Sequence, residues 1–308
     1  MTDQTETVDH RTVLAALPPA ARADFTERRD EPGLLRLGLH LGAILILGAV
    51  IAAKPPWWGV LLPIQGVLIV FLFCLLHEAI HGTAFRTSWV NTAAARIAAF
   101  ALMLPPDWFR YFHLAHHRHT QDPAHDPELA APWPTTWRAY LWRVSGLPVW
   151  ADHVKTLVRN ARGRCDDDYV PPAGRTRVRR EARLMLAGYA AVASLAFGFG
   201  AQELIWVWIV PALLGQPFLR LYLMAEHGRC PLVANMLENT RTTFTTSLVR
   251  LLAWNMPYHA EHHSLPAAPF HRLPDLHARM AAHLRETERG YARFHLKTAA
   301  RLSHSRGA

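Results

Sequence analysis

The sequence is short of charge and of cysteine. Only 19% of its 308 residues are charged and 51% are hydrophobic, whereas soluble domains carry closer to a quarter charged residues. The three cysteines, Cys74, Cys165 and Cys230, lack metal-type spacing and leave one unpaired, so neither a disulfide framework nor a zinc finger is supported. This composition also excludes a disordered or collagen-like chain.

A secretory signal is missing too, because residues 1–33 contain no basic stretch followed by an apolar run. We therefore expect this polar segment to stay on the cytoplasmic side of a membrane. Beyond it, four apolar stretches are long enough to cross a bilayer: 34–53, 57–76, 184–202 and 204–225. A helix of about 20 residues reaches roughly 30 Å, the thickness of the hydrocarbon core.

The stretch 57–76 is the clearest of these, because it contains no charged residue and begins with Trp57 and Trp58, which suit a membrane interface. A fifth apolar stretch, 93–104, is short and contains Arg96, so a re-entrant or interfacial helix is predicted there. The sequence thus predicts an all-α integral membrane protein with four transmembrane helices and one such short helix.

The distribution of basic residues predicts the orientation. The loops 54–56 and 200–203 contain one basic residue between them, whereas 155–183 contains nine. The positive-inside rule then places both termini and the basic loop in the cytoplasm of a multi-pass cell-membrane protein. Contact with anionic lipid explains the net charge of +9 more simply than nucleic acid does, so no nucleic-acid partner is expected.

No internal repeat or linker divides the chain. We expect a membrane domain over 34–280 with a helical cytoplasmic cap, followed by a cytoplasmic C-terminal tail over 281–308. The polar segments 107–183 and 226–308 would form the cap.

Nineteen histidines are present, and eight of them form three short clusters. These are His77-Glu-Ala-Ile-His81, His113-Leu-Ala-His116-His117 and His259-Ala-Glu-His262-His263. Residues three or four apart share one face of a helix, so each cluster can direct imidazoles at one target. If 93–104 does not cross the membrane, all three clusters lie on the same side.

Neutral imidazoles bind iron, copper, zinc and nickel. Eight of them exceed the needs of one metal ion, so a two-metal centre that the cap holds is predicted. The isolated histidines are interpreted as structural or surface residues; they are His10, His40, His125, His153, His283, His295 and His304.

The three boxes, with four spans around them, resemble the integral-membrane fatty acid desaturase family over roughly residues 34–280. The resemblance implies a non-heme diiron centre with two iron ions, O2 as co-substrate and an acyl-chain tunnel that leads toward the membrane. No ferredoxin-type cysteine pattern or heme domain is fused. The electron donor would therefore be a separate protein of the ferredoxin, rubredoxin or cytochrome type.

The resemblance also implies metal ligands. His227, next to Glu226, stands where the family often has an additional ligand, which gives a set of nine: His77, His81, His113, His116, His117, His227, His259, His262 and His263. Asn255 would hold a metal-bound water, and His119 would be a supporting or structural residue. Acidic residues are expected to orient the imidazoles; the candidates are Glu78, Asp107, Asp122, Asp126, Glu226 and Glu261.

Several other functions remain open. His77-Glu78-Ala-Ile-His81 also matches the H-E-x-x-H motif of zinc proteases, although that leaves the two later boxes unexplained. A metal transporter would place its ligands near the bilayer midplane rather than beyond the spans. A hydroxylase or oxygenase of an acyl chain, carotenoid or alkane shares the same boxes. The favoured prediction is O2-dependent desaturation of a lipid-linked fatty acyl chain.

Overall fold

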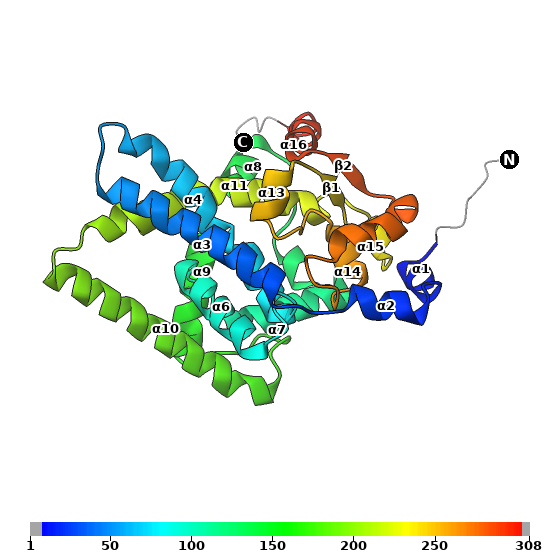
Figure 1. The fold of residues 1–308 in the computed structure, drawn as a ribbon, viewed down its shortest axis with the longest axis horizontal. Coiled ribbons are helices and arrows are strands. Elements are labelled where there is room, and N and C mark those ends of the chain that lie inside the picture. The colour runs from blue at the N-terminus through cyan, green and yellow to red at the C-terminus, as the bar shows by residue number, and fades with distance from the viewer. Residues whose placement is uncertain (1–7, 304–308) are drawn as a thin grey trace.

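The computed structural model describes residues 8–303, so His304 lies outside the described residues. Long helices gather on one side of the molecule, and short helices with a small sheet gather on the other (Figure 1). The long side consists of α3 (Glu31–Ala52), η1 (Trp58–Leu61), α4 (Leu62–Val70), α5 (Leu72–His81), α10 (Pro172–Gly198), η3 (Ile205–Ile209) and α11 (Val210–His227).

Three of these helical stretches are long and apolar enough to cross a membrane: Glu31–Ala52, Trp58–His81 and Ile205–His227. They contain almost all of the predicted spans 34–53, 57–76 and 204–225. On α3, Leu35, Leu45 and Ile46 are 67%, 71% and 70% exposed, and such exposure of leucine and isoleucine suits contact with lipid rather than water. The second and third stretches each end on a histidine.

The predicted span 184–202 has a different outcome. It falls in α10, which ends at Gly198 and is not one of the three candidate spans within the described residues. The apolar part of α10, Leu184–Gly198, is only about 22 Å long. Phe197 and Phe199 at its end are 90% and 83% exposed. A fourth crossing therefore stays a prediction.

The helices α4 and α11 approach each other very closely at a pair of glycines. A Cβ atom on Gly66 would lie 2.0 Å from the carbonyl oxygen of Pro211, and one on Gly215 would lie 2.2 Å from the carbonyl carbon of Gly66. Small residues at such a crossing let two backbones pack together, as is common between membrane helices. This crossing fixes α11, which carries His227, against the segment that carries the first histidine box.

The two weakly charged loops, 54–56 and 200–203, lie at the same end of the molecule (Figure 1). Lys54 Nζ lies 4.0 Å from Glu203 Oε1, and the rings of Trp58 and Trp206 are 5.2 Å apart. The histidine-bearing ends of α5 and α11 lie at the opposite ends of the same helices. This arrangement agrees with the predicted separation of the weakly charged loops from the metal centre.

The predicted short helix over 93–104 is α6 (Ser88–Ala101). It has 14 residues and is not a candidate span. Its buried face, which includes Ala94 and Ala98, belongs to the main hydrophobic core together with Leu75 and Leu76 of α5. The helix α6 therefore packs against the box-one helix.

The short elements form the part that we call the cap. They are α1 (His10–Ala15), α2 (Pro19–Phe25), α7 (Pro106–His119), η2 (Pro127–Ala130), α8 (Trp137–Val144), α9 (Leu147–Ala161), α12 (Met236–Asn239), β1 (Thr242–Phe244), α13 (Ser247–Leu252), α14 (His259–Ser264), α15 (Leu273–Met280), η4 (Ala281–His283), β2 (Thr287–Arg289) and α16 (Tyr291–Ala299).

The cap corrects the all-α prediction in one respect. The strands β1 and β2 pair in parallel, with Thr242 opposite Thr287. Strands of three residues show no periodicity in a sequence, which is why this pair was missed. After β2, Phe294 of α16 is only 4% exposed and packs with Tyr140 of α8 and Met224 of α11, so α16 is a packed part of the cap.

Candidate metal centre

The first histidine box lies in the last turn of α5. The spacing of four residues places His77 and His81 on one face of this helix, and their ring centroids are 5.1 Å apart. Gly82 ends the helix in the left-handed conformation, with a φ of 73°. A glycine there costs little strain, so the helix can stop directly after its second histidine.

The second box lies on α7, whose first turn is fixed from outside. The carboxylate of Glu181, on α10, accepts hydrogen bonds from the backbone N–H groups of Asp107 at 2.9 Å and Trp108 at 3.3 Å. A carboxylate at a helix N-terminus satisfies free N–H groups and interacts favourably with the helix dipole. Arg177 of α10 also pairs with Asp107 at 2.5 Å. Through these contacts, α10 fixes the N-terminus of α7, the helix that carries three of the candidate ligands.

The third box forms α14, a short helix in which all six residues are buried. Glu261, on this helix, accepts a hydrogen bond from Thr242 Oγ1 of β1 at 2.5 Å and contacts His277 Nδ1 of α15. The small sheet and α15 therefore position the third box.

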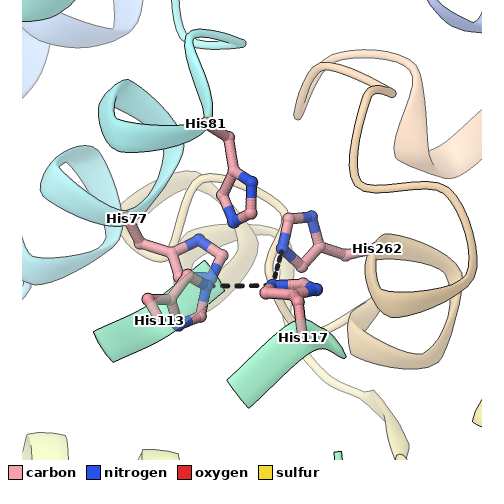
Figure 2. Close-up of side chains that lie close together, drawn as sticks. All are labelled: His77, His81, His113, His117 and His262. Carbon is pink, nitrogen blue, oxygen red and sulfur yellow. Dashed lines mark hydrogen bonds between the residues drawn. The ribbon is translucent and has the colours of Figure 1, made fainter. Parts of the chain in front are cut away.

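Five imidazoles from α5, α7 and α14 converge to form what we call the first group (Figure 2). They are His77, His81, His113, His117 and His262, each of which offers one nitrogen within 4.8 Å of the others. His113 Nε2 lies 2.9 Å from His117 Nε2, which lies 3.2 Å from His262 Nε2. Side chains far apart in the sequence thus point at one small volume.

The remaining four candidate ligands form the second group. His116, His227 and His263 each offer a nitrogen within 4.8 Å of the others. His259 joins them, because its Nε2 lies 3.1 Å from His227 Nε2. The rings of His117 and His263 stack at 4.0 Å, so the two groups adjoin.

Burial keeps most of these imidazoles neutral. For His113, His117, His259, His262 and His263, burial holds the pKa well below the usual histidine value, and neighbouring imidazoles lower it further. A neutral imidazole has a free lone pair and is the form that binds a metal. His116 differs: burial lowers its pKa, but the carboxylates of Glu128 and Asp126 raise it by more.

The outer nitrogens of the second group face oxygen atoms. His116 Nδ1 lies 2.9 Å from Asp126 Oδ1, and His263 Nδ1 lies 3.1 Å from Thr120 Oγ1. His227 Nδ1 lies 3.3 Å from the carbonyl oxygen of Asn239, and His259 Nδ1 lies 3.5 Å from Glu226 Oε1. The partners of His116, His263 and His227 fix the ring orientation and favour a proton on Nδ1, which leaves Nε2 free for a metal. His259 Nδ1 lies near the Glu226 carboxylate but makes no hydrogen bond within the described residues.

The first group has no comparable partners within residues 8–303. The Nδ1 atoms of His77, His113, His117 and His262 are buried without a hydrogen bond. Aromatic packing supports two of these rings: Phe109 stacks on His113 at 5.5 Å, and Phe73 lies 6.4 Å from His77.

Four of the six predicted orienting acids have other partners, which corrects the expectation for them. Glu78 Oε2 accepts hydrogen bonds from Thr83 Oγ1 at 2.9 Å and from the backbone N–H of Phe270 at 3.2 Å. Asp107 pairs with Arg177, Glu261 with His277 and Thr242, and Asp122 with His125. Only Asp126 and Glu226 face box histidines. A carboxylate within a box therefore need not orient that box, because its direction depends on the helix face it occupies.

Sequence reasoning missed three residues that border the second group. Thr120 and Asn239 contact outer nitrogens, and Glu128 Oε2 lies 3.8 Å from His116 Nε2. Thr120 follows His116 by four residues, a spacing that pointed to the same helix face. The other two follow from tertiary contacts that no local pattern encodes.

Two further predictions concern Asn255 and His119. Asn255 Nδ2 donates to the carbonyl oxygen of Phe270 at 2.9 Å, so its amide nitrogen braces the loop after box three; a role in holding water stays a prediction. His119 is in neither group and lies instead beside Asp122 and His125.

Several isolated histidines have structural partners, as expected. His40 Nε2 lies 2.8 Å from the carbonyl oxygen of Leu68, and His153 Nδ1 lies 2.9 Å from that of Leu102. His295 Nε2 lies 2.7 Å from the carbonyl oxygen of Leu221. These rings connect helices and are not in the two groups.

Comparison with known proteins agrees with this geometry. The sequence profile described as fatty acid desaturase matches residues 55–295, which include both groups. A similar protein is the sn-1 oleoyl-lipid 12-desaturase of Picosynechococcus sp., which is 30% identical over 90 residues, or 28% of this chain. The match covers only 25% of the length of that relative. Because the family profile spans most of the chain and all three histidine boxes, the chain belongs to the fatty acid desaturase family.

Proposed function

We propose that the protein is a membrane diiron oxidoreductase that desaturates a lipid-linked fatty acyl chain with O2. The observation that carries this proposal is the convergence of nine buried or half-buried imidazoles into two adjoining groups. A single metal ion needs about four to six ligands, so two ions account for nine histidines better than one.

The residues present fit two metal ions. His77 Nε2, His81 Nε2 and His263 Nε2 are buried without a hydrogen-bond partner, and leaving such groups unsatisfied costs free energy. Pairs of Nε2 atoms also lie 2.9–3.2 Å apart. Such short separations are expected of nitrogen atoms whose lone pairs are directed at a common cation. Bound metal ions would satisfy all of these nitrogens.

The first group would hold one iron and the second group the other. Two irons bound there would supply the activation of O2 that removal of hydrogen from an unactivated C–H bond requires, with the reducing electrons coming from the donor. The histidines bring no negative charge, so the carboxylates of Asp126, Glu226 and Glu128 around the second group would offset part of the positive charge. Burial of the box helices would keep bulk water from the reacting carbon.

The position of the ligands supports an acyl substrate. His77 and His81 end the candidate span Trp58–His81, and His227 ends the candidate span Ile205–His227. An apolar chain that lies in the bilayer beside these helices would reach the imidazoles without crossing water. Positioning of one pair of methylene groups would then decide where the double bond forms.

The charge pattern supports a cytoplasmic active site in the cell membrane. The basic loop and the cap lie toward the histidine-bearing ends of the spans, whereas the loop between α3 and η1 and the loop between α10 and η3 lie at the other end (Figure 1). Electrons would come from a separate donor of the ferredoxin, rubredoxin or cytochrome type. Exposed arginines of the cap would attract an acidic donor as well as anionic lipid.

The zinc-protease alternative has little geometric support. Its general base would be Glu78, but this carboxylate accepts hydrogen bonds from Thr83 and Phe270. The closer alternative is hydroxylation of an acyl chain, a carotenoid or an alkane on the same scaffold. In desaturation, two hydrogens leave adjacent carbons, and O2 receives two further electrons and two protons to become two waters. In hydroxylation, one oxygen atom stays in the product.

The test supplies iron-replete protein with a reduced donor, oxygen-18 gas and membranes that contain acyl lipids deuterated at adjacent carbons. We expect an alkene that has lost two deuteriums and contains no oxygen-18, by mass spectrometry of the lipids. A product that retains oxygen-18 and has lost one deuterium would assign hydroxylation instead. The variant His283→Gln should give the same product as the unchanged protein, because His283 is in neither group.

A further inference from the structure

A third cluster of metal-ligating side chains lies outside the two groups, just after box two. It consists of His119, Asp122 and His125, each of which offers one ligand atom within 4.8 Å of the others. His125 Nδ1 lies 2.7 Å from Asp122 Oδ2, and His119 Nδ1 lies 4.0 Å from the same oxygen. The side chains are 63%, 40% and 35% exposed for His125, Asp122 and His119, so solvent reaches all three.

Hydrogen bonds fix the backbone that carries these three side chains. His119 is the last residue of α7, and the backbone N–H of Asp122 donates to its carbonyl oxygen at 2.8 Å. The backbone N–H of Asp126 donates to the carbonyl oxygen of Asp122 at 2.9 Å. Gln121 reverses the chain with a φ of 63°. A ligand set on such a loop loses little conformational entropy when it binds an ion.

The same loop is tied to the second group. Gln121 Nε2 donates to the carbonyl oxygen of His227 at 2.9 Å, and the Gln121 N–H donates to Asp126 Oδ2 at 2.8 Å. Asp126 in turn contacts His116 Nδ1. The exposed cluster is thus anchored to the buried centre but has no ligand in common with it.

The carboxylate of Asp122 is oriented toward the imidazoles. Its Oδ1 accepts a hydrogen bond from the Ala124 N–H at 3.0 Å, which leaves Oδ2 to face both histidines. The hydrogen bonds from His125 and from Ala124 hold the pKa of Asp122 below its usual value. The carboxylate is therefore ionised at neutral pH and available as a ligand.

We propose that His119, Asp122 and His125 bind a divalent transition-metal ion at the protein surface. Two imidazoles and one carboxylate suit zinc, cobalt, nickel, copper or iron, whereas magnesium and calcium prefer sites built of oxygen ligands alone. Three protein ligands leave positions for water. The ion would therefore exchange with solvent, unlike ions in the buried groups. This site would be additional to the proposed diiron centre.

The test uses full-length, iron-replete protein and Co2+ as the probe, because the visible absorption of Co2+ reports its ligands. We expect one additional Co2+ per chain, displaced by Zn2+, with no change in iron content. The double variant His119→Gln, His125→Gln should bind this Co2+ at least about tenfold more weakly, and Asp122→Asn should weaken it as well. His283→Gln is the control and should bind Co2+ like the unchanged protein.

Retained iron shows that the variants are folded and that the probe has not entered the buried centre. Equal Co2+ binding by the unchanged protein and the double variant would overturn the proposal, as would the absence of additional Co2+. Loss of iron in step with Co2+ uptake would also overturn it, because the probe would then be reporting the buried groups.

Discussion

The two groups of histidines face inward alike but differ in what lies behind them. In the second group, the outer nitrogens of His116, His227 and His263 have oxygen partners, of which Asp126 at 2.9 Å from His116 is the nearest. The fourth, His259 Nδ1, lies 3.5 Å from Glu226 Oε1 without a hydrogen bond. In the first group, the outer nitrogens of His77, His113, His117 and His262 have no hydrogen-bond partner within the described residues. Phenylalanine rings contact two of these imidazoles instead.

This difference implies that the groups keep their geometry by different means. Hydrogen bonds to Nδ1 fix both the tautomer and the ring angle of His116, His227 and His263 in the second group. On the outer side of the first group, aromatic packing rather than hydrogen bonding supports the rings of His77 and His113. The second group should therefore depend on a few polar residues, and the first on the hydrophobic core around it.

The largest effect is expected when a ligand is removed from either group. His113→Ala in the first group and His227→Ala in the second should each lower the iron content from about two to about one per chain. Turnover should fall by more than the roughly 100-fold that loss of an outer partner costs. Iron analysis and product formation check both outcomes.

The control for this comparison is His119→Ala, because His119 is in neither group. This variant should keep its iron and measurable turnover. If His119→Ala and His227→Ala lost equal amounts of iron, the assignment of His227 as a ligand in preference to His119 would be wrong.

A smaller effect is expected when the packing behind the first group is removed. Phe109 is 4% exposed and stacks on His113, so Phe109→Ala should lower the free energy of unfolding by about 3–5 kcal/mol. The first group should lose iron before the second, because His113 is free to tilt. Thermal unfolding and the rate of iron loss to a chelator measure the two effects.

Phe112→Ala is the matched control, since Phe112 lies on the same helix but is only partly buried and stacks on Trp108. It should destabilise the protein less and leave the rate of iron loss nearly unchanged. The same rate of iron loss in both variants would mean that packing on His113 does not hold the first group.

The smallest effect is expected from Asp126→Asn. The amide keeps the shape of the side chain but removes the negative charge that faces His116. Iron in the second group should bind about tenfold more weakly, while the first group keeps its iron. Asp152→Asn, at an exposed residue that pairs with Lys155, should change neither. Equal iron loss from both groups in Asp126→Asn would show that the outer partners do not distinguish them.

Local spacing was sufficient to predict much of this centre. Residues three and four apart on a helix share a face, so the boxes on α5, α7 and α14 could be predicted to direct their imidazoles together. Long apolar runs likewise predicted the three helical stretches that are candidate spans, and the family resemblance pointed to His227.

The remaining features depend on contacts between distant segments. The partner of His227 is the carbonyl oxygen of Asn239, and β1 pairs with β2 across more than forty residues; no local periodicity encodes either contact. Glu78 stands inside a box, yet its carboxylate contacts Phe270. Which acid faces which imidazole is decided by the packing of the cap.

Counting the bound metal tests most directly whether the two groups hold two irons. The full-length protein would be purified in detergent, loaded with Fe2+ without air, freed of loosely held ions and analysed for iron, zinc and protein in one sample. We predict two irons per chain in active protein. One zinc per chain and no iron in active protein would contradict the diiron proposal.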